Sequence, residues 1–220
     1  MEKHIVKVLS TNFVTHNVKH FEVEKPEGYT FTSGQATDVS LNKPGLEDDL
    51  HPFTFTSLNG WENLEFTIKI YTDHDGLTNK LLNINAGDEL IIHEVFGTIA
   101  YKQPGLFIAG GAGVTPFISI LRKLKQQNHL KGNTLLFANH NEADIILKAE
   151  FEDMLGEHFI NVIKHPTHGE GQTLNREFLS KYVNKEIANY YVCGPDEFVK
   201  DMIANLEALG VKKEQIVFEQ

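Results

Sequence analysis

The sequence predicts two domains of different class, an N-terminal antiparallel β-barrel and a C-terminal α/β domain with a parallel sheet. Strand-like segments follow one another over roughly the first hundred residues with almost no helix between them. From about residue 103 onward, short apolar strands alternate with segments of helical periodicity. The turn-rich stretch Lys102-Gln103-Pro104-Gly105 separates the two patterns, so we place the domains at residues 1–102 and 103–220.

The N-terminal strands are expected where β-branched and aromatic residues gather or where apolar and polar residues alternate. These segments are residues 5–9, 18–23, 38–41, 53–56, 64–70 and 89–92. One short helix is expected at 78–82, with Thr78 as its N-cap because a threonine hydroxyl can accept an unpaired backbone N–H. Strands at this spacing with few helices are typical of a closed or nearly closed barrel.

The C-terminal segments alternate in type. Strands are expected at residues 106–109, 134–138, 159–163, 190–192 and 215–218, and helices from about 116 and at 143–155, 175–182 and 196–209. Such alternation implies a parallel sheet with helices on both faces.

Composition and charge narrow the classes of function. The net charge of −10 makes binding to nucleic acid unfavourable, since phosphate backbones require clustered Lys and Arg. The single cysteine, Cys193, cannot form an internal disulfide, which favours a reducing compartment. The chain has no signal segment at its start and no apolar run of about 18 residues, so we expect a cytoplasmic protein without membrane association.

The 11 histidines raise the question of a metal site. His165 and His168 have a ligand-like spacing, but they lie in a Pro/Gly-rich stretch without a matching Cys or carboxylate pattern. We therefore expect no metal. One cysteine also excludes an internal cysteine-ligated iron–sulfur cluster.

A glycine-rich segment, Gly110-Gly111-Ala112-Gly113-Val114-Thr115-Pro116, follows a buried strand and opens a helix. Backbone N–H groups and the positive end of a helix converge at such a junction and suit a diphosphate. Glycines remove the Cβ atoms that would block its approach, and Pro116 is compatible with a first helical turn. The segment predicts nucleotide binding; a glycine-rich turn without a ligand is the alternative.

Three further motifs accompany this segment: His51-Pro52-Phe53-Thr54 at the start of a barrel strand, Gly76-Leu77-Thr78 before a helix, and Cys193-Gly194-Pro195 at a second strand-to-helix junction. With four motifs in this order, the sequence resembles the ferredoxin–NADP reductase superfamily, in the branch of ferredoxin or flavodoxin reductases and oxygenase reductases. The resemblance extends over nearly the whole chain and implies a flavin-binding barrel followed by an NAD(P)-binding domain.

On the flavin side, the resemblance assigns binding roles to His51, Pro52, Phe53, Thr54, Ile68, Lys69, Ile70, Gly76, Leu77 and Thr78. Phe53 is expected along the isoalloxazine ring, and Thr54 near its N5 atom. His51 replaces the family's arginine, so bidentate binding of the flavin phosphate is lost, and Lys69 is a candidate to offset the lost charge. Phe53 replaces a tyrosine and keeps the stacking surface. Phe53 and Phe55 also suit a purely structural role inside the barrel.

On the nicotinamide side, the resemblance assigns binding roles to Gly111, Gly113, Thr115, Pro116, Cys193, Gly194 and Pro195. Thr115 is expected near both rings and Cys193 near the hydride path, although a small buried hydrophobe is the alternative role for this cysteine. Glu219 resembles an acidic residue beside the flavin in some members; a solvated terminal carboxylate is the alternative. Thr54, Cys193 and Glu219 are thus the candidate catalytic residues.

These expectations combine into one hypothesis. A hydride passes from NADH or NADPH to FAD (or FMN), and electrons then pass to a ferredoxin, a flavodoxin or a small-molecule acceptor, in a protein expected to be a monomer. The stretch from Asn139 to Asp144 has two acids and no arginine, which favours NADH, although Lys148 and Lys164 are possible phosphate ligands. An electron-transfer subunit of a larger complex and a non-catalytic nucleotide-binding module without flavin remain as alternatives.

Overall fold

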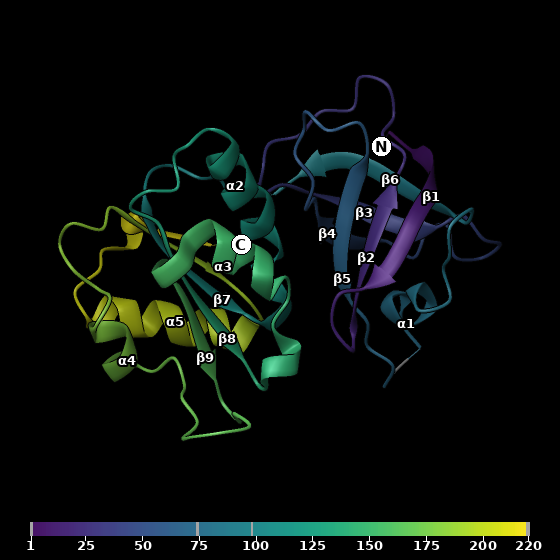
Figure 1. Ribbon diagram of the computed structural model, residues 1–220. Coiled ribbons are helices and arrows are strands. Elements are labelled where there is room, and N and C mark those ends of the chain that lie inside the picture. The colour runs from purple at the N-terminus through teal and green to yellow at the C-terminus, as the bar shows by residue number, and fades with distance from the viewer. Residues whose placement is uncertain (1, 74, 98, 219–220) are drawn as a thin grey trace.

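The computed structural model describes residues 2–73, 75–97 and 99–218, and the statements below refer to these residues. Two lobes lie side by side in Figure 1, one built of strands alone apart from a single short helix and the other of a sheet with helices around it.

The N-terminal lobe is an antiparallel barrel, as predicted. Its strands are β1 (His4–Phe13), β2 (Val18–Val23), β3 (Ala36–Leu41), β4 (His51–Thr54), β5 (Leu64–Lys69) and β6 (Glu89–Phe96). They are ordered β4-β3-β6-β1-β2-β5, and every pair is antiparallel. An antiparallel bridge between Phe55 and Phe66 joins the two outer strands, and the N–H of Thr56 donates to the carbonyl of Glu65 over 2.8 Å. This join closes the sheet, which removes the exposed edges of an open one.

The two phenylalanines of the His51–Thr56 segment have different environments. Phe55 is fully buried in the barrel core, where its ring stacks on Phe31 at 4.2 Å. Phe53 is half-buried and packs only at the margin of that core. The structural role weighed for both residues therefore fits Phe55, while Phe53 keeps a surface for another partner.

The short helix α1 (Leu77–Leu81) begins one residue earlier than predicted, so the assignment of Thr78 as its N-cap is wrong. Gly76 holds the cap position in extended conformation, and its carbonyl accepts the N–H groups of Asn79 and Lys80. A glycine without a side chain suits this tight entry into the helix, which places Thr78 inside the first turn.

The C-terminal lobe contains the predicted parallel sheet, with strands β7 (Gly105–Gly110), β8 (Thr134–Asn139), β9 (Phe159–Ile163), β10 (Asn189–Cys193) and β11 (Ile216–Phe218) in the order β11-β10-β7-β8-β9. Every pairing is parallel. Its α-helices are α2 (Thr115–Gln126), α3 (Lys148–Leu155), α4 (Arg176–Ser180) and α5 (Asp196–Ala208). Four 3₁₀ turns, η1 (Gly111–Val114), η2 (Glu142–Asp144), η3 (Gly156–His158) and η4 (Lys213–Gln215), complete the described helices.

The continuous helix expected at 143–155 is divided in two. The turn η2 is closed by reciprocal hydrogen bonds between Asn141 and Asp144, and Leu147 adopts a left-handed backbone (φ 50°) before α3 begins. These side-chain bonds cap the start of η2. The turn ends at Ile145, whose backbone is extended, so η2 and α3 do not join into one helix.

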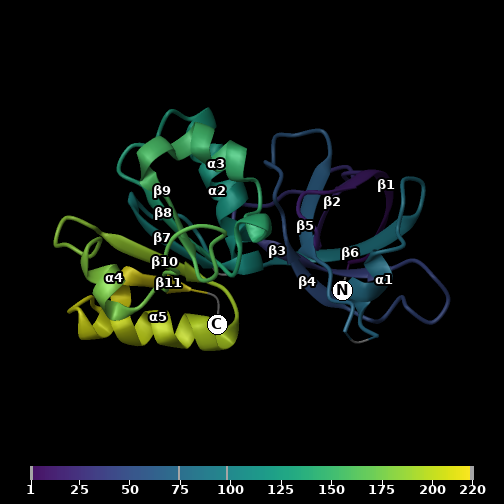
Figure 2. The same cartoon turned by 60° about the horizontal axis from the view of Figure 1, so that its bottom comes forward.

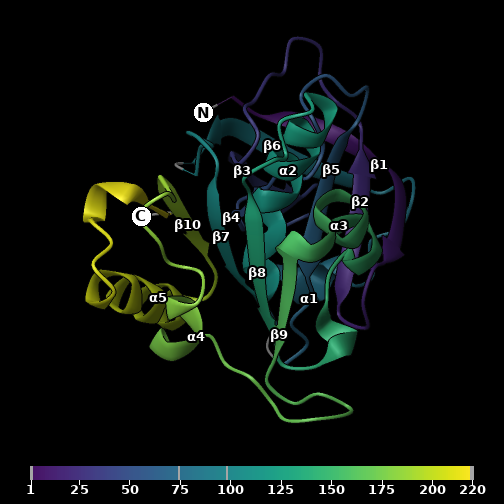
Figure 3. The ribbon, with the colours of Figure 1, turned by 60° about the vertical axis from the view of Figure 1, so that its left-hand side comes forward.

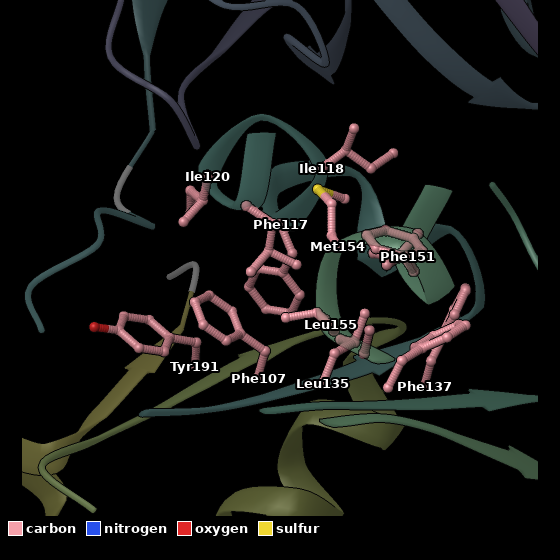
Figure 4. Packing of buried hydrophobic residues seen from close by; sticks show 14 of the residues in the cluster. Phe107, Phe117, Ile118, Ile120, Leu135, Phe137, Phe151, Met154, Leu155 and Tyr191 are labelled. Atoms are coloured by element: carbon pink, nitrogen blue, oxygen red, sulfur yellow. The ribbon is translucent and has the colours of Figure 1, made fainter. Parts of the chain in front are cut away.

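Helices cover both faces of the sheet. Figure 2 shows α2 and α3 on one face and α4 and α5 on the other. On the first face, a stack of aromatic rings joins α2 to the strands (Figure 4): Phe107 packs against Tyr191 at 4.5 Å and against Phe117 at 5.0 Å. The strands are seen along their length in Figure 3, where the segment after β9 extends away from the sheet before it returns to α4.

The connection between the lobes is fixed by Tyr191. Its hydroxyl donates to the carbonyl of Gln103 (2.8 Å) and accepts the N–H groups of Lys102 (3.0 Å) and Gln103 (3.1 Å). Burial raises the pKa of this hydroxyl, so it stays protonated and able to donate. The division at 102/103 remains a prediction; the last barrel strand ends at Phe96 and the first strand of the parallel sheet begins at Gly105.

Candidate cofactor-binding cleft

A cavity of about 1180 Å³ lies between the two lobes and is lined by residues of both. This volume exceeds the roughly 300–1,000 Å³ of a typical small-molecule pocket. It therefore offers room for more than one ligand of ordinary size, as a site shared by two dinucleotides requires.

On the side of the parallel sheet, the cavity wall is made by two backbone turns in contact. A Cβ added to Gly113 would lie 2.4 Å from the N atom of Gly194 and 2.5 Å from the carbonyl oxygen of Cys193. Only glycine allows this approach, because a real Cβ does not come so close to backbone atoms. The structure thus brings together the two predicted nicotinamide motifs, and all seven of their assigned residues line the cavity: Gly111, Gly113, Thr115, Pro116, Cys193, Gly194 and Pro195.

On the barrel side, six of the ten residues assigned to the flavin line the cavity: Pro52, Phe53, Thr54, Ile68, Lys69 and Thr78. The other four, His51, Ile70, Gly76 and Leu77, are not among the described lining residues. Ile70 and Leu77 are buried in the barrel core instead. A family motif is a continuous stretch of chain, whereas the direction of the side chains changes from residue to residue. Some residues of a motif therefore point into the core and not into the cavity.

His51 lies against a carboxylate. Its Nε2 atom is 3.1 Å from Oδ1 of Asp49, and the Nζ atom of Lys80 is 3.8 Å from Oδ2 of the same aspartate. Lys80 also lies 3.8 Å from Asp75. A phosphate at this end of the barrel would meet the imidazole of His51 and the ammonium group of Lys80, both of which already contact Asp49. Sequence reasoning missed Lys80, although its place two residues after Thr78 was a usable signal.

Of the three candidate catalytic residues, the structure describes Thr54 and Cys193. Thr54 is half-buried at the end of β4 and lines the cavity. Cys193 is partly buried at the end of β10, where it lines the cavity and also packs against the core beneath α2. Both roles weighed for this cysteine are thus compatible with its place. Glu219 lies outside the described residues.

Asn139, at the carboxyl end of β8, is a lining residue that sequence reasoning did not assign. Its side chain is 8% exposed, and neither its amide nitrogen nor its oxygen has a hydrogen-bond partner among the described residues. A buried amide without partners costs about 1–3 kcal/mol. A polar ligand in the cavity is the kind of partner that would offset this cost, so the residue fits a nucleotide site.

The acids after β8 have partners of their own. The carboxylate of Glu142 accepts the backbone N–H (3.0 Å) and the hydroxyl (3.1 Å) of Thr167, and these hydrogen bonds lower the pKa of Glu142. Asp144, which lines the cavity, accepts the N–H of Asn141 and lies 3.6 Å from Nε2 of His16. Among the described lining residues, Lys69 and Lys164 are the only lysines, and no arginine is present.

The described residues contain no group of three His, Cys, Asp or Glu side chains arranged to hold a metal ion. None of their helices has both the length and the apolar character needed to cross a membrane.

The chain matches two family models. Residues 3–130 match the FAD-binding domain, and residues 107–203 match the oxidoreductase NAD-binding domain. The chain is also 27% identical over 228 residues to NADH–cytochrome b5 reductase 1 of Arabidopsis thaliana, covering 94% of this chain and 80% of that protein. It is 26% identical over 215 residues to the reductase component of propane 2-monooxygenase of Rhodococcus jostii, covering 89% of this chain but only 57% of that protein.

Solved structures share the fold. The ferredoxin NADP⁺ reductase of Neisseria gonorrhoeae with bound FAD and NADP has a TM-score of 0.85 at 18% identity, covering 100% of this chain and 98% of that one. The cytochrome b5 reductase domain of Ulva prolifera nitrate reductase has a TM-score of 0.83 at 21% identity, covering 99% and 97%. At such identities the likeness concerns the fold alone.

Proposed function

This chain belongs to the ferredoxin–NADP reductase superfamily, as an NAD(P)H-dependent flavin oxidoreductase with an FAD-binding domain, and we propose that NADH is its donor and a separate redox protein its acceptor. The observation that carries the proposal is the single cavity lined by Phe53 and Thr54 of the barrel and by the glycine turns of the parallel sheet. Bound FAD supplies the chemistry of accepting a hydride from NAD(P)H and releasing electrons one at a time.

We assign the barrel residues to orienting the flavin. Phe53 offers an aromatic wall, and the Thr54 hydroxyl a hydrogen bond, at the point where β4 reaches the cavity. Thr78 and Lys69 supply a hydroxyl and a positive charge for phosphate oxygens.

The residues of the parallel sheet are assigned to the nicotinamide cofactor. The turn from Gly111 into α2 presents backbone N–H groups to a diphosphate, and Thr115 begins the helix there. Cys193 and Gly194 lie against this turn and continue the same wall of the cavity, beside the place assigned to the nicotinamide ring.

The preference for NADH rests on charge. A 2′-phosphate usually needs an arginine or lysine beside the strand that follows the glycine-rich turn. From the last residue of β8 to residue 146, the described lining residues include one carboxylate and no lysine or arginine; they are Asn139, His140, Asn141, Asp144 and Ile146. Lys164, from the end of β9, is the nearest candidate for NADPH.

For the acceptor, the sequence suggests a ferredoxin, a flavodoxin or a small molecule, and the relatives' names add two classes, cytochrome b5 and the partners of an oxygenase reductase component. The net charge of −10 disfavours a strongly acidic carrier unless a local basic patch receives it. A subunit of an oxygenase system is the second candidate, favoured by the similarity to the Rhodococcus component.

The test begins with colour. The purified protein should be yellow and release FAD, with FMN as the other possible flavin. Anaerobic NADH should bleach it at least tenfold more efficiently than NADPH does, since tenfold corresponds to about 1.4 kcal/mol of discrimination. A colourless protein that does not bind added flavin contradicts the proposal.

Turnover with ferricyanide, a ferredoxin, a flavodoxin and a cytochrome b5 then ranks the acceptors. Failure with all of them, but success in a co-purified complex, supports the oxygenase-subunit candidate.

A further inference from the structure

Arg122, on the third turn of α2, makes two side-chain hydrogen bonds to the barrel lobe. Its side chain is 15% exposed. The Nη1 atom donates to the carbonyl oxygen of Thr56 and to Oε2 of Glu65, each over 2.8 Å. The Nε and Nη2 atoms donate to the two carboxylate oxygens of Glu150 over 2.6 and 2.9 Å. One guanidinium therefore joins α2 to the barrel on one side and to α3 on the other.

The barrel groups that receive Arg122 belong to the cavity's flavin side. Thr56 lies two residues after Thr54, and its hydroxyl is 3.3 Å from that of Thr67, which lines the cavity. Glu65 belongs to β5, the strand that also carries Lys69 into the cavity. Neither Arg122 nor Glu65 is itself among the described lining residues.

The other end of α2 belongs to the nicotinamide side. The helix begins at Thr115, about 10 Å from Arg122 at a rise of 1.5 Å per residue. Between them, the Ser119 hydroxyl accepts the backbone N–H of Gly34 of the barrel over 3.1 Å. A rigid helix thus carries a cavity-lining residue at its start and two hydrogen-bonded attachments to the opposite lobe farther along.

We propose that Arg122 is a positioning residue for hydride transfer, setting the distance between the nicotinamide turn at the start of α2 and the flavin-binding strands β4 and β5. This inference rests on the proposed function. A misplacement of about 1 Å between reacting groups can cost about 100-fold in rate. A buried ion pair contributes little net stability, because desolvation offsets its attraction, so the value of this one lies in geometry.

Five variants separate the contacts. Arg122→Met removes all of them, Glu65→Gln weakens the barrel side alone, and Glu150→Gln weakens the α3 side alone. Lys125→Met is the matched control, since Lys125 lies on the same helix and pairs with Asp153 at the surface, within one lobe. Arg122→Lys keeps the charge but loses the planar fork.

Rapid mixing of the FAD-loaded protein with NADH measures the hydride step. We expect the rate to fall about 10- to 100-fold in Arg122→Met and about tenfold in Glu65→Gln. Flavin content and the Kd for NADH should stay within about threefold of the parent. The hydride rate of the double variant Arg122→Met/Glu65→Gln should be no lower than that of Arg122→Met alone. Glu150→Gln and Lys125→Met should keep the parent rate, and Arg122→Lys should lie between.

Trp61 gives a readout that needs no turnover. It is the chain's single tryptophan, and its ring centre is 5.3 Å from Cζ of Arg122. Its emission should shift in Arg122→Met, and X-ray scattering should show a wider arrangement of the lobes. The emission should not shift in Lys125→Met.

A parent-like hydride rate in flavin-loaded Arg122→Met and Glu65→Gln overturns the proposal, and so does an equal loss in Glu150→Gln. If Arg122→Met does not retain flavin, Glu65→Gln decides alone. If NADH does not bleach the parent protein, the proposed function fails. In that case, unchanged scattering and Trp61 emission in Arg122→Met would overturn the attachment itself, so the two failures are distinguishable.

Discussion

In the nicotinamide-side half of the cavity two backbone turns touch each other, whereas in the flavin-side half the wall comes from side chains on separate strands. Gly113 and Gly194 belong to the first half, where contact distances leave no room for a Cβ. Phe53, Thr54 and Lys69 belong to the second, where they line the cavity. A wall made of backbone tolerates few substitutions, while a wall made of side chains can be rebuilt by several.

This difference offers a physical reason why the sequence resembles the superfamily unequally in the two halves. By that resemblance the glycine turns match the superfamily's pattern, while His51 and Phe53 take the places expected for its arginine and tyrosine. The first half is under steric constraint from its own backbone. The flavin-side half is constrained mainly by its ligand. Different residues can therefore provide the charge and the aromatic surface that the ligand needs.

The largest effect is expected from Gly113→Ala. The new Cβ would lie 2.4–2.5 Å from backbone atoms of Cys193 and Gly194, so the two turns must separate. Overpacking of this kind costs about 1–3 kcal/mol. Because we assign the displaced turns to the nicotinamide cofactor, we expect kcat/KM for NADH to fall about 100-fold, while flavin content is kept.

Gly111→Ala is the matched control for this change. Gly111 has φ of +53° but no atom within 4 Å of an added Cβ, so the cost is conformational, about 1–2 kcal/mol, without a clash. Equal kinetic losses in the two variants would contradict the steric account of this half.

The next effect concerns a buried lysine that supports the flavin side. Lys19 is 4% exposed, and its Nζ atom donates to the carbonyls of Leu81 (3.3 Å), Leu82 (2.9 Å) and Ile84 (2.6 Å) at the end of α1. Burial lowers its pKa, although the charge of Asp88 opposes this. Lys19→Met leaves three carbonyls without this donor, so we expect a loss of about 1–3 kcal/mol in unfolding free energy and weaker retention of FAD, because α1 carries Thr78.

Thermal melts and flavin release under dilution measure both effects. Lys7→Met, a change of the same kind at an exposed position of β1, should alter neither. If Lys19→Met lowers the melting temperature but retains FAD like the parent, the link between α1 and flavin binding is wrong.

The fold was largely predictable because the two sequence patterns that indicate it are local. Alternation of apolar residues marked the strands, and the change to helical periodicity marked the second domain. The errors arose where single residues interrupt a helical pattern, as Ile145 and Leu147 do between η2 and α3, or where a glycine serves as a cap, as at Gly76.

The nicotinamide half of the site was predictable for a similar reason, since glycines record close backbone contacts directly in the sequence. The flavin half was less so. The burial of Leu77 and Ile70 in the core depends on contacts with residues outside their motifs, and so does the lack of a partner for the Asn139 side chain among the described residues. The contact between Asp49 and His51 is local in sequence but involves a residue that the motif does not include.

A smaller effect, on the free energy of unfolding, is expected when the pH is lowered, because Glu65 joins the two halves. Although burial opposes ionisation, the hydrogen bond with His20 and the charge of Arg122 hold the pKa of Glu65 below its ordinary value. A carboxyl with a lowered folded-state pKa stabilises the fold above its unfolded pKa of about 4.5, and this contribution is lost as the pH falls through the folded-state pKa.

Urea unfolding between pH 7 and pH 3 measures this contribution. Glu65→Gln should be less stable than the parent at pH 7 by about 1–3 kcal/mol, and the gap should narrow below pH 4.5. A gap that is independent of pH would exclude the ionisation of Glu65 as its cause. Asp153→Asn, which alters an exposed pair inside one lobe, serves as the control.

The smallest effect is expected from His51→Arg, which restores the family's residue on the side-chain-built half. A guanidinium adds a permanent charge and bidentate geometry, so FAD should bind more tightly if residue 51 meets the flavin phosphate. Because Asp49 lies 3.1 Å from the imidazole, it will pair with the arginine too, and we expect a gain of no more than about threefold in affinity. In Asp49→Asn/His51→Arg that competition is absent, and the gain should rise to about tenfold. Titration of the apoprotein with FAD gives both values. Unchanged affinity in the double variant would place residue 51 away from the phosphate and leave Lys80 and Lys69 as the cations of this half.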